Sequence, residues 1–276
     1  MDSSPTVPRI ALRNGTAIPQ IGFGLWGFDD ESVQPVLADV FKAGYRMIDT
    51  GDEYHNERGV GLAIRASGLP RDELFVTTKV YDASGYDATM RAFDASLGRL
   101  GLDHLDLYLI HWPMGDRDQT ADAWRAMERL LADGRVRAVG VSNFYADDLR
   151  HLLARARTAP LVNQIELHPW CSQAAQRALD REHGIVTQAW GPLGRGRGLL
   201  ESGPLRDVAD RHGRSPAQVA LRWQVQLGVV SIPKSTDPRR MAENLEVFDF
   251  TLDEQDLAAL AVLDDGRLVG PYARPF

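Results

Sequence analysis

Short apolar runs alternate with helical segments along most of the 276-residue chain, and this alternation restricts the possible folds more than any other feature. Eight runs are predicted as strands, at residues 20–25, 46–48, 74–78, 105–110, 136–141, 161–165, 185–189 and 229–232. Helical spacing of apolar residues is found between them, at residues 32–43, 57–66, 86–100, 120–132, 147–156, 173–183, twice within 204–226, and at 238–245. Strands that alternate with helices indicate a parallel sheet, and eight such units predict an α/β fold of the (β/α)8 TIM barrel type.

Two segments lie outside this eightfold pattern. Asn14-Gly15 stands between two short apolar runs, which predicts a β-hairpin over residues 9–18 that would cover one end of the barrel. Residues 253–263 have the spacing of an extra amphipathic helix, and the tail 266–276 is expected to be irregular. No low-complexity linker divides the chain, so we expect one domain over residues 1–276.

Composition limits the function classes. A net charge of −7 and a pI near 5.5 argue against binding to nucleic acid or to an anionic membrane surface. The chain has one cysteine, Cys171, so it cannot form an internal disulfide, which fits a reducing compartment. Residues 1–8 show no signal peptide, and the longest apolar runs are too short to span a bilayer. We expect a cytoplasmic monomer whose partner is a small molecule.

In a barrel of this type the active site forms at the carboxyl ends of the strands. Nearly every predicted strand is followed there by a polar or aromatic side chain. These are, in chain order, Gly24-Leu25-Trp26, Asp49, Lys79, His111-Trp112, Ser142-Asn143, Gln164 with Glu166, Trp190, and Lys234-Ser235. Chance would scatter such residues over both ends of the barrel, so we expect this end to carry the function.

Asp49, Tyr54, Lys79 and His111 form the subset with the most specific chemistry. A tyrosine with its ordinary pKa of about 10 is a weak proton donor at neutral pH, and a nearby lysine cation would lower that pKa. Asp49 can supply the counter-charge that a lysine on an apolar strand needs. His111 can orient a carbonyl oxygen, so that the group together would protonate an oxyanion as it forms.

Each of these residues also has a structural interpretation. Taken alone, Lys79 is more often a solvated strand end, Asp49 a cap of the next turn, His111 a hydrogen-bonded pocket histidine and Tyr54 a loop aromatic. The four structural interpretations are less convincing in combination, because the predicted barrel brings all of these residues to one face.

Several segments resemble motifs of the aldo-keto reductase family, in the family's order. The first is residues 47–61 (MIDTGDEYHNERGVG), which contain Asp49, Tyr54, Asn56 and Glu57 at the family spacing. The others are residues 106–113 (DLYLIHWP), 140–144 (GVSNF), 163–169 (NQIELHP) and 232–236 (IPKST). Within the family the chain is most similar to prokaryotic reductases of the 2,5-diketo-D-gluconate type. The main reason is residues 190–194 (WGPLG), because mammalian relatives usually have tyrosine in place of Trp190.

The resemblance implies NADPH-dependent reduction of a small carbonyl compound, an α-dicarbonyl or a keto-sugar to the alcohol. Tyr54 would be the general acid, Lys79 with Asp49 would tune its pKa, and His111 would orient the carbonyl. A further set would hold the nicotinamide, with Ser142, Asn143 and Gln164 on its carboxamide and Trp190 stacked on its ring. Hydride would pass from the nicotinamide C4 to the carbonyl carbon.

The rest of the cofactor would lie along two later segments. No G-x-G-x-x-G follows a strand, so a Rossmann site is excluded. The segment Gly191, Pro192, Leu193, Gly194 continues into a glycine-arginine loop, which is either a flap over the pyrophosphate or a solvated loop. By family alignment Lys234, Ser235 and Arg240 would bind the adenosine 2′-phosphate and Asn244 the adenine, which favours NADPH over NADH. Arg239 is expected to face solvent. Gly24, Leu25, Thr236 and Glu243 complete the predicted cofactor surface.

The chain departs from the family pattern beside Tyr54. Most relatives have a small residue where this chain has Asp52, and often glycine in place of His55. Both side chains either change the pH profile or substrate preference, or they point to solvent. The predicted substrate pocket has an aromatic entrance formed by Trp26, Tyr81 and Trp112 beside His111, with Phe276 as a further candidate and a short loop at 114–119. Tyr81 replaces a tryptophan found in many relatives.

Two other functions are alternatives to a reductase. A nicotinamide-nucleotide-binding regulatory protein with little turnover could use the same barrel, because fold does not fix function. The intact set of Asp49, Tyr54, Lys79 and His111 favours the enzyme. A metal-dependent hydrolase would need clustered His, Asp and Glu ligands at the strand ends, and the sequence places no such set there, so no metal is expected.

Overall fold

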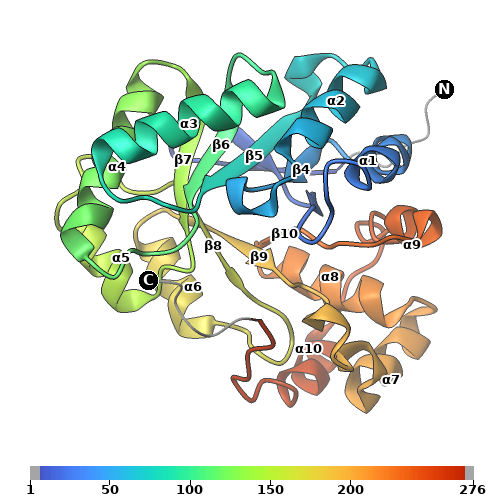
Figure 1. The fold of residues 1–276 in the computed structure, drawn as a ribbon. Helices are drawn as coiled ribbons and strands as arrows, with labels where there is room; N and C mark the ends of the chain where they lie inside the picture. The colour runs from blue at the N-terminus through green and yellow to red at the C-terminus, as the bar shows by residue number, and fades with distance from the viewer. Residues whose placement is uncertain (1–6, 271–276) are drawn as a thin grey trace.

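The computed structural model describes residues 7–270 and contains an eight-stranded parallel barrel surrounded by helices (Figure 1). The barrel strands are β3 (Phe23–Gly24), β4 (Met47–Asp49), β5 (Phe75–Val80), β6 (Leu105–Ile110), β7 (Val136–Ser142), β8 (Val162–Glu166), β9 (Val186–Trp190) and β10 (Val230–Ser231). Each strand pairs with the next in chain order. The barrel closes where Ser231 bonds the segment before β3, accepting from Gly22 N at 2.9 Å and donating to Gln20 O at 2.9 Å. The predicted TIM barrel is confirmed.

Helices follow the strands along the outside of the barrel. They are α1 (Val33–Lys42), α2 (Glu57–Ser67), α3 (Tyr86–Leu100), α4 (Arg117–Ala132), α5 (Ala146–Leu153), α6 (Ala174–Glu182), α7 (Gly203–His212), α8 (Pro216–Gln226) and α9 (Pro238–Glu243). The extra helix α10 (Glu254–Ala261) packs against α7, where Asp256 pairs with Arg211 and His212. Short 3-10 turns occur at η1 (Asp52–Tyr54), η2 (Arg71–Glu73), η3 (Gly194–Gly196) and η4 (Leu199–Glu201). Across residues 7–270, no helix combines the length and apolar character needed to cross a membrane.

The predicted hairpin is present and closes the end of the barrel where the strands begin. Strands β1 (Arg9–Ala11) and β2 (Ala17–Pro19) pair antiparallel, with Ile10 opposite Ile18. Ile18 is fully buried in one apolar cluster with Met47 and Leu107, which lie at or near the starts of their strands. Because this end is covered by apolar packing, the polar site is left to the opposite end.

Several element boundaries differ from the sequence-based prediction, and three of them affect loops or strands near the site. Helix α4 begins at Arg117 rather than at residue 120, because the Asp116 carboxylate caps it by accepting from Asp118 N at 2.9 Å. The loop predicted at 114–119 is therefore shorter. Helix α9 ends at Glu243 instead of residue 245. Strand β5 continues to Val80, so Lys79 lies inside a buried strand and not at its end.

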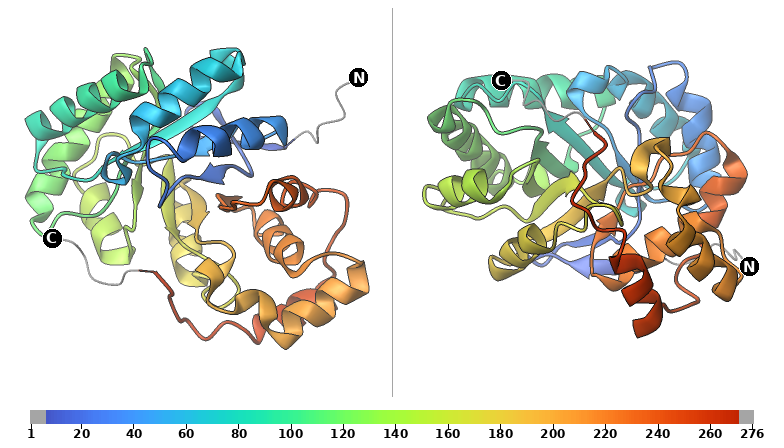
Figure 2. Two further views of the ribbon diagram at one scale, coloured as in Figure 1. Left: turned by 45° about the vertical axis from the view of Figure 1, so that its right-hand side comes forward. Right: turned by 90° about the horizontal axis from the view of Figure 1, so that it is seen from below.

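The last described segment crosses the mouth of the barrel. In the right-hand view of Figure 2 it runs in dark red from α10 across the barrel end. The Glu166 carboxylate, at the end of β8, holds it by accepting from Val269 N at 2.5 Å and from Gly270 N at 3.1 Å. Residues 266–270 have no helix or strand, as expected for the tail, and Phe276 lies outside the described residues.

Candidate active site

A cavity of about 1010 Å³ opens at the carboxyl ends of the strands. It collects the predicted catalytic, cofactor and substrate residues except Lys79 and Gly194. Those in its lining are Gly24, Leu25, Trp26, Asp49, Tyr54, Tyr81, His111, Trp112, Ser142, Asn143, Gln164, Trp190, Gly191, Pro192, Leu193, Lys234, Ser235, Thr236, Arg240, Glu243 and Asn244. Lys79 lies beneath the lining in contact with it, and Gly194 is buried against Leu199.

Lys79 joins two of the predicted catalytic residues. Its ammonium donates to an Asp49 carboxylate oxygen, to Thr50 O at 2.7 Å and to Tyr54 Oη at 3.2 Å. The lysine side chain is fully buried. An ammonium has three protons, and these three oxygens account for all of them. The ion pair with Asp49 is therefore what allows a lysine to occupy a strand that is buried along its whole length.

The pKa of Tyr54 differs in direction from the sequence-based expectation. Burial raises the pKa of the phenol, Lys79 lowers it, and the negative charges of Asp49 and Glu53 raise it again, so that the net shift is upward. The expected lowering by Lys79 is present but is smaller than the cost of desolvating a phenolate. Tyr54 is consequently a neutral phenol at physiological pH and holds a proton that it can donate.

His111 follows β6 and faces the tyrosine. Its ring lies 5.7 Å from the Tyr54 ring and 5.8 Å from the Tyr81 ring, in edge-to-face geometry in both cases. Burial and the Lys79 charge hold the pKa of His111 well below its usual value, so the imidazole is neutral. Its Nδ1 atom is buried and has no hydrogen-bond partner within residues 7–270.

Two residues of the first motif hold the Tyr54 loop in place. Asn56 is fully buried, and its amide donates to Leu25 O and Phe28 O at 3.0 Å each, which ties the loop to the segment after β3. Glu57, at the start of α2, accepts from Thr78 Oγ1 at 2.5 Å and from Arg99 Nε at 2.7 Å. Their spacing from Tyr54 therefore has a structural reason, and they do not face the reacting groups.

Amide and hydroxyl groups of β7, β8 and β9 form a connected network beside Asp49. Gln164 Nε2 donates to Asp49 Oδ2 at 2.7 Å and to Gln188 Oε1 at 2.9 Å, which uses both of its amide protons. Asn143 donates to His111 O at 3.0 Å and accepts from Trp190 Nε1 at 2.9 Å. Ser142 Oγ donates to Gln164 O at 2.9 Å. The network fixes these side chains and the indole in one arrangement.

The other end of the cavity is cationic. Lys234 Nζ donates to Trp26 O at 2.6 Å and lies 4.1 Å from the Phe28 ring centroid, and the Arg195 guanidinium lies 4.4 Å from the Trp26 centroid. Burial and the charge of Arg195 lower the pKa of Lys234. Within the described part of the chain, neither of them nor Arg240 forms an ion pair with a carboxylate. This donor set fits a bound polyanion such as a phosphorylated cofactor.

The two departures beside Tyr54 have different outcomes. Asp52 points inward, where its carboxylate accepts from Tyr81 N at 3.0 and 3.2 Å, and burial raises its pKa to about 6. His55 is exposed and adopts a left-handed backbone conformation. Arg239 is also exposed, as expected, and pairs with Asp237.

Some lining residues were not predicted. The structure adds Glu53, Ile232, Pro233, Asp237, Leu200, Glu201 and residues 215–217, and it places residues 195–197 of the glycine-arginine loop in the lining. Residues 215–218 (SPAQ) do carry a signal, because Ser215 and Gln218 form a capping box with proline at the first helical position of α8. Glu53 has none, since its side-chain direction depends on the η1 turn.

The chain is similar to known proteins along almost its whole length. Residues 20–265 match the Aldo/keto reductase family. The chain is 46% identical over 270 residues to an aldo-keto reductase from Mycolicibacterium smegmatis, covering 98% of each protein. It is 48% identical to morphine 6-dehydrogenase from Pseudomonas putida (97% of this chain, 95% of the relative) and 45% identical to glyoxal reductase from Bacillus subtilis (95% of each).

Solved structures give the same result. An aldo/keto reductase from Brucella melitensis superposes with a TM-score of 0.91 at 46% identity, over 94% of this chain and 98% of that one. A variant of Gox0644, solved in complex with NADPH, superposes with a TM-score of 0.90 at 42% identity, over 95% of this chain and 96% of that one. The chain belongs to the aldo/keto reductase family.

Proposed function

We propose that this oxidoreductase reduces an aldehyde or a ketone to the alcohol with NADPH, and that Tyr54 supplies the proton. The observation that carries the proposal is the connected chain of Asp49, Lys79 and Tyr54 with neutral His111 beside it, at the base of a cavity with a cationic end. The family membership and the NADPH complexes of structural neighbours support it.

The residues would divide the work as follows. His111 would hold the carbonyl oxygen close to Tyr54 Oη, and Tyr54 would donate its proton to that oxygen. The Lys79 ammonium, 3.2 Å from Tyr54 Oη, would stabilise the phenolate that remains, and Asp49 keeps this lysine charged. Trp26, Tyr81 and Trp112 would exclude water from the reacting atoms. When bound, the cofactor supplies the hydride that adds to the carbonyl carbon.

Residues along the cavity would bind the cofactor. The side-chain oxygen Oε1 of Gln164 is left as an acceptor for the nicotinamide carboxamide, because both side-chain amide protons are used inside the protein. Ser142 and Asn143 lie beside it, and Trp190 is held where it could stack on the ring. Arg195 and Lys234 suit the phosphates, with Ser235 and Arg240 beside them for the 2′-phosphate and Asn244 for the adenine.

The substrate is not fixed by the family. Two relatives of similar identity are named for different compounds, morphine and glyoxal, although each aligns over almost the whole chain. The 2,5-diketo-D-gluconate type of reductase stays a prediction. So do the monomeric state, the cytoplasmic location and the single domain over residues 1–276.

The test follows NADPH oxidation against aldehydes, α-dicarbonyls and keto-sugars, with NADH in parallel. We expect turnover on part of the panel. Tyr54→Phe should lower turnover by at least roughly 100-fold, because the general acid is removed. NADPH binding should change little. Unchanged turnover in this variant would refute the mechanism. Tight NADPH binding by the wild-type protein without turnover on any compound would instead favour the regulatory function.

A further inference from the structure

A carboxylate that the proposed reaction does not use lies at the substrate end of the active-site cavity. Glu53 is the middle residue of η1, directly before Tyr54. Its side chain is 42% exposed and lines two cavities, the active-site cavity and a second one of about 590 Å³ on the other side of η1. Glu53 therefore stands in the wall between the two. Partial burial raises the pKa of its carboxyl, the hydrogen bond from Tyr81 opposes this shift, and the exposed part of the side chain keeps the carboxylate hydrated.

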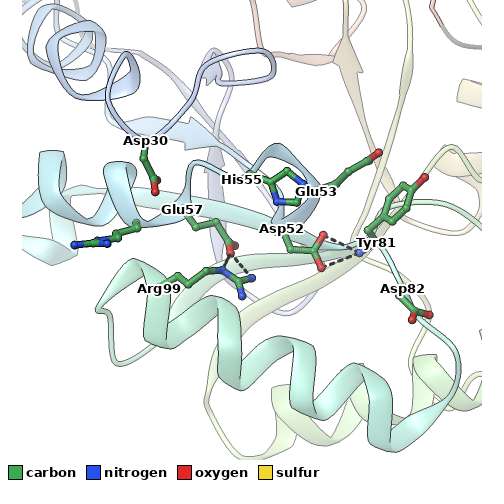
Figure 3. Close-up of a pocket in the computed structure, with 9 residues that line it drawn as sticks. Asp30, Asp52, Glu53, His55, Glu57, Tyr81, Asp82 and Arg99 are labelled. Atoms are coloured by element: carbon green, nitrogen blue, oxygen red, sulfur yellow. Dashed lines mark hydrogen bonds and ion pairs between the residues drawn. The ribbon is translucent and has the colours of Figure 1, made fainter.

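The Glu53 carboxylate points toward the groups that surround the substrate carbonyl in the proposed function. Its Oε2 lies 3.7 Å from His111 Nδ1, the buried nitrogen without a hydrogen-bond partner within residues 7–270. The Tyr81 side chain hydrogen-bonds to Glu53. Figure 3 shows the Glu53 carboxylate and the Tyr81 hydroxyl extending to the same side, away from the ion pair of Glu57 and Arg99.

Within residues 7–270, no cation cancels this charge at the substrate end. Among the described residues, Glu53 forms no ion pair with a lysine or an arginine. The one basic side chain within 4 Å of its carboxylate is His111, and this imidazole is neutral. Lys79 is fully used by Asp49, Thr50 and Tyr54. Arg195 and Lys234 lie against Trp26, at the end suited to the cofactor phosphates.

The negative field of Glu53 reaches the reacting groups. It raises the pKa of Tyr54 and of Tyr81, in each case in addition to burial. A charged group on a substrate held between Tyr54 and His111 would feel the same field across a few ångströms of partly desolvated space. The interaction between two charges strengthens as the surroundings lose water, because the effective dielectric constant falls.

We propose that Glu53 is a specificity-determining residue that favours carbonyl substrates with a cationic amine and disfavours substrates with a carboxylate or a phosphate. The inference rests on the proposed carbonyl reduction, because the substrate position is defined by Tyr54 and His111. It concerns a residue that the reaction itself does not require, since Glu53 neither holds the proton to be transferred nor contacts Lys79.

The test compares benzaldehydes that differ in the charge of the para substituent. The cationic probe carries a trimethylammonium group, its neutral isostere a tert-butyl group, and the anionic probe a carboxylate. Glu53→Gln removes the charge and keeps the size of the side chain. We expect kcat/KM to fall by about 10-fold for the cation, to rise by about 10-fold for the anion, and to change less than about 2-fold for the isostere. Intrinsic reactivity cancels because each probe is compared between variants.

Two further variants make the result specific. Glu31→Gln removes one negative charge from an exposed position outside both cavities, and should leave all three probes unchanged. Glu53→Lys should invert the order of the cationic and anionic probes. If Glu53→Gln folds normally and the ratio of the two charged probes moves by less than about 2-fold, the proposal is wrong.

Failure of the proposed function gives a different result. In that case wild-type protein would oxidise no NADPH with any of the three aldehydes, whichever residue stands at 53. Binding of benzyltrimethylammonium and of benzoate to the protein–NADPH mixture, followed by tryptophan fluorescence, then decides the question. A preference for the cation that Glu53→Gln removes supports the charge assignment, and equal binding in both proteins overturns it.

Discussion

At the scale of single residues, the burial of Lys79 is the strongest energetic constraint in the site. The lysine is fully buried inside β5, and Asp49 beside it is almost as inaccessible. Removal of one member leaves the other as an unpaired buried charge, which typically costs about 3–5 kcal/mol. Removal of both members costs less, because an apolar pair of similar volume needs no desolvation of charge.

The buried pair of Lys79 and Asp49 predicts the order of stabilities in a double-mutant cycle. Lys79→Met should lower the free energy of unfolding by roughly 3–5 kcal/mol, whereas Lys79→Met combined with Asp49→Leu should recover a part of that loss. Turnover should be absent in both, because the phenolate of Tyr54 has lost its cation. Urea unfolding measures the stabilities, and a double variant no more stable than Lys79→Met alone would contradict the argument.

Two exposed cations, Lys234 and Arg240, predict the cofactor selectivity. Lys234 and Arg240 line the cationic end of the cavity and form no ion pair within residues 7–270. If they bind the 2′-phosphate, Lys234→Ala with Arg240→Ala should weaken NADPH binding by about 10- to 100-fold more than NADH binding, since each charge-assisted hydrogen bond contributes about 1.5–3 kcal/mol. Arg239→Ala is the matched control, because Arg239 is 92% exposed and pairs with Asp237. Titration of both cofactors by fluorescence measures the effect, and equal losses would remove the assignment.

At the scale of elements, the position of α2 against α3 depends on one glycine. A Cβ at Gly61 would lie 2.0 Å from Leu100 O, a backbone atom at the end of α3. Gly98 also lies in a helix, α3, but a Cβ there would meet no atom within 4 Å. The same substitution should therefore act in opposite directions at the two sites.

We expect Gly61→Ala to destabilise the protein by about 1–3 kcal/mol, because the two helices must separate to admit the methyl group. Gly98→Ala should stabilise it by about 0.5–1 kcal/mol through helix propensity. Denaturant midpoints of the two variants test this directly. A Gly61→Ala protein as stable as the Gly98→Ala protein would show that α2 is free to shift.

The same scale shows how far the sequence predicts this molecule. The alternation of apolar runs and the Asn14-Gly15 signal are local, and they were sufficient for the barrel and its hairpin. The carboxyl ends of the strands predicted a large part of the cavity lining, but not Glu53 or residues 215–217. The sequence did not decide whether the Asp52 side chain points toward the site or to solvent. Its acceptance from Tyr81 N joins residues 29 positions apart, and such a contact depends on the packing of η1 against β5.

At the scale of the whole molecule, the burial of Asp52 makes folding stability depend on pH. Burial raises the pKa of this carboxyl to about 6, with Glu57 adding to the shift and Tyr81 N opposing it. An aspartate in an unfolded chain has a pKa of about 3.9. Between these values the folded protein binds more protons than the unfolded chain. Linkage then requires that Asp52's contribution to the free energy of unfolding falls as pH rises from about 4 to about 6.

Asp52→Asn isolates this contribution, because asparagine resembles the protonated carboxyl and can still accept from Tyr81 N. The free energy of unfolding of the variant should exceed that of the wild-type protein by an amount that grows by on the order of 1–3 kcal/mol from pH 4 to pH 7. The reason is that only the wild-type protein must bury a charge at position 52 as the pH rises. Urea unfolding at a series of pH values measures the difference. Parallel curves for the two proteins would mean that Asp52 titrates as it does in the unfolded chain, and that its carboxylate is hydrated as well in the fold as in water.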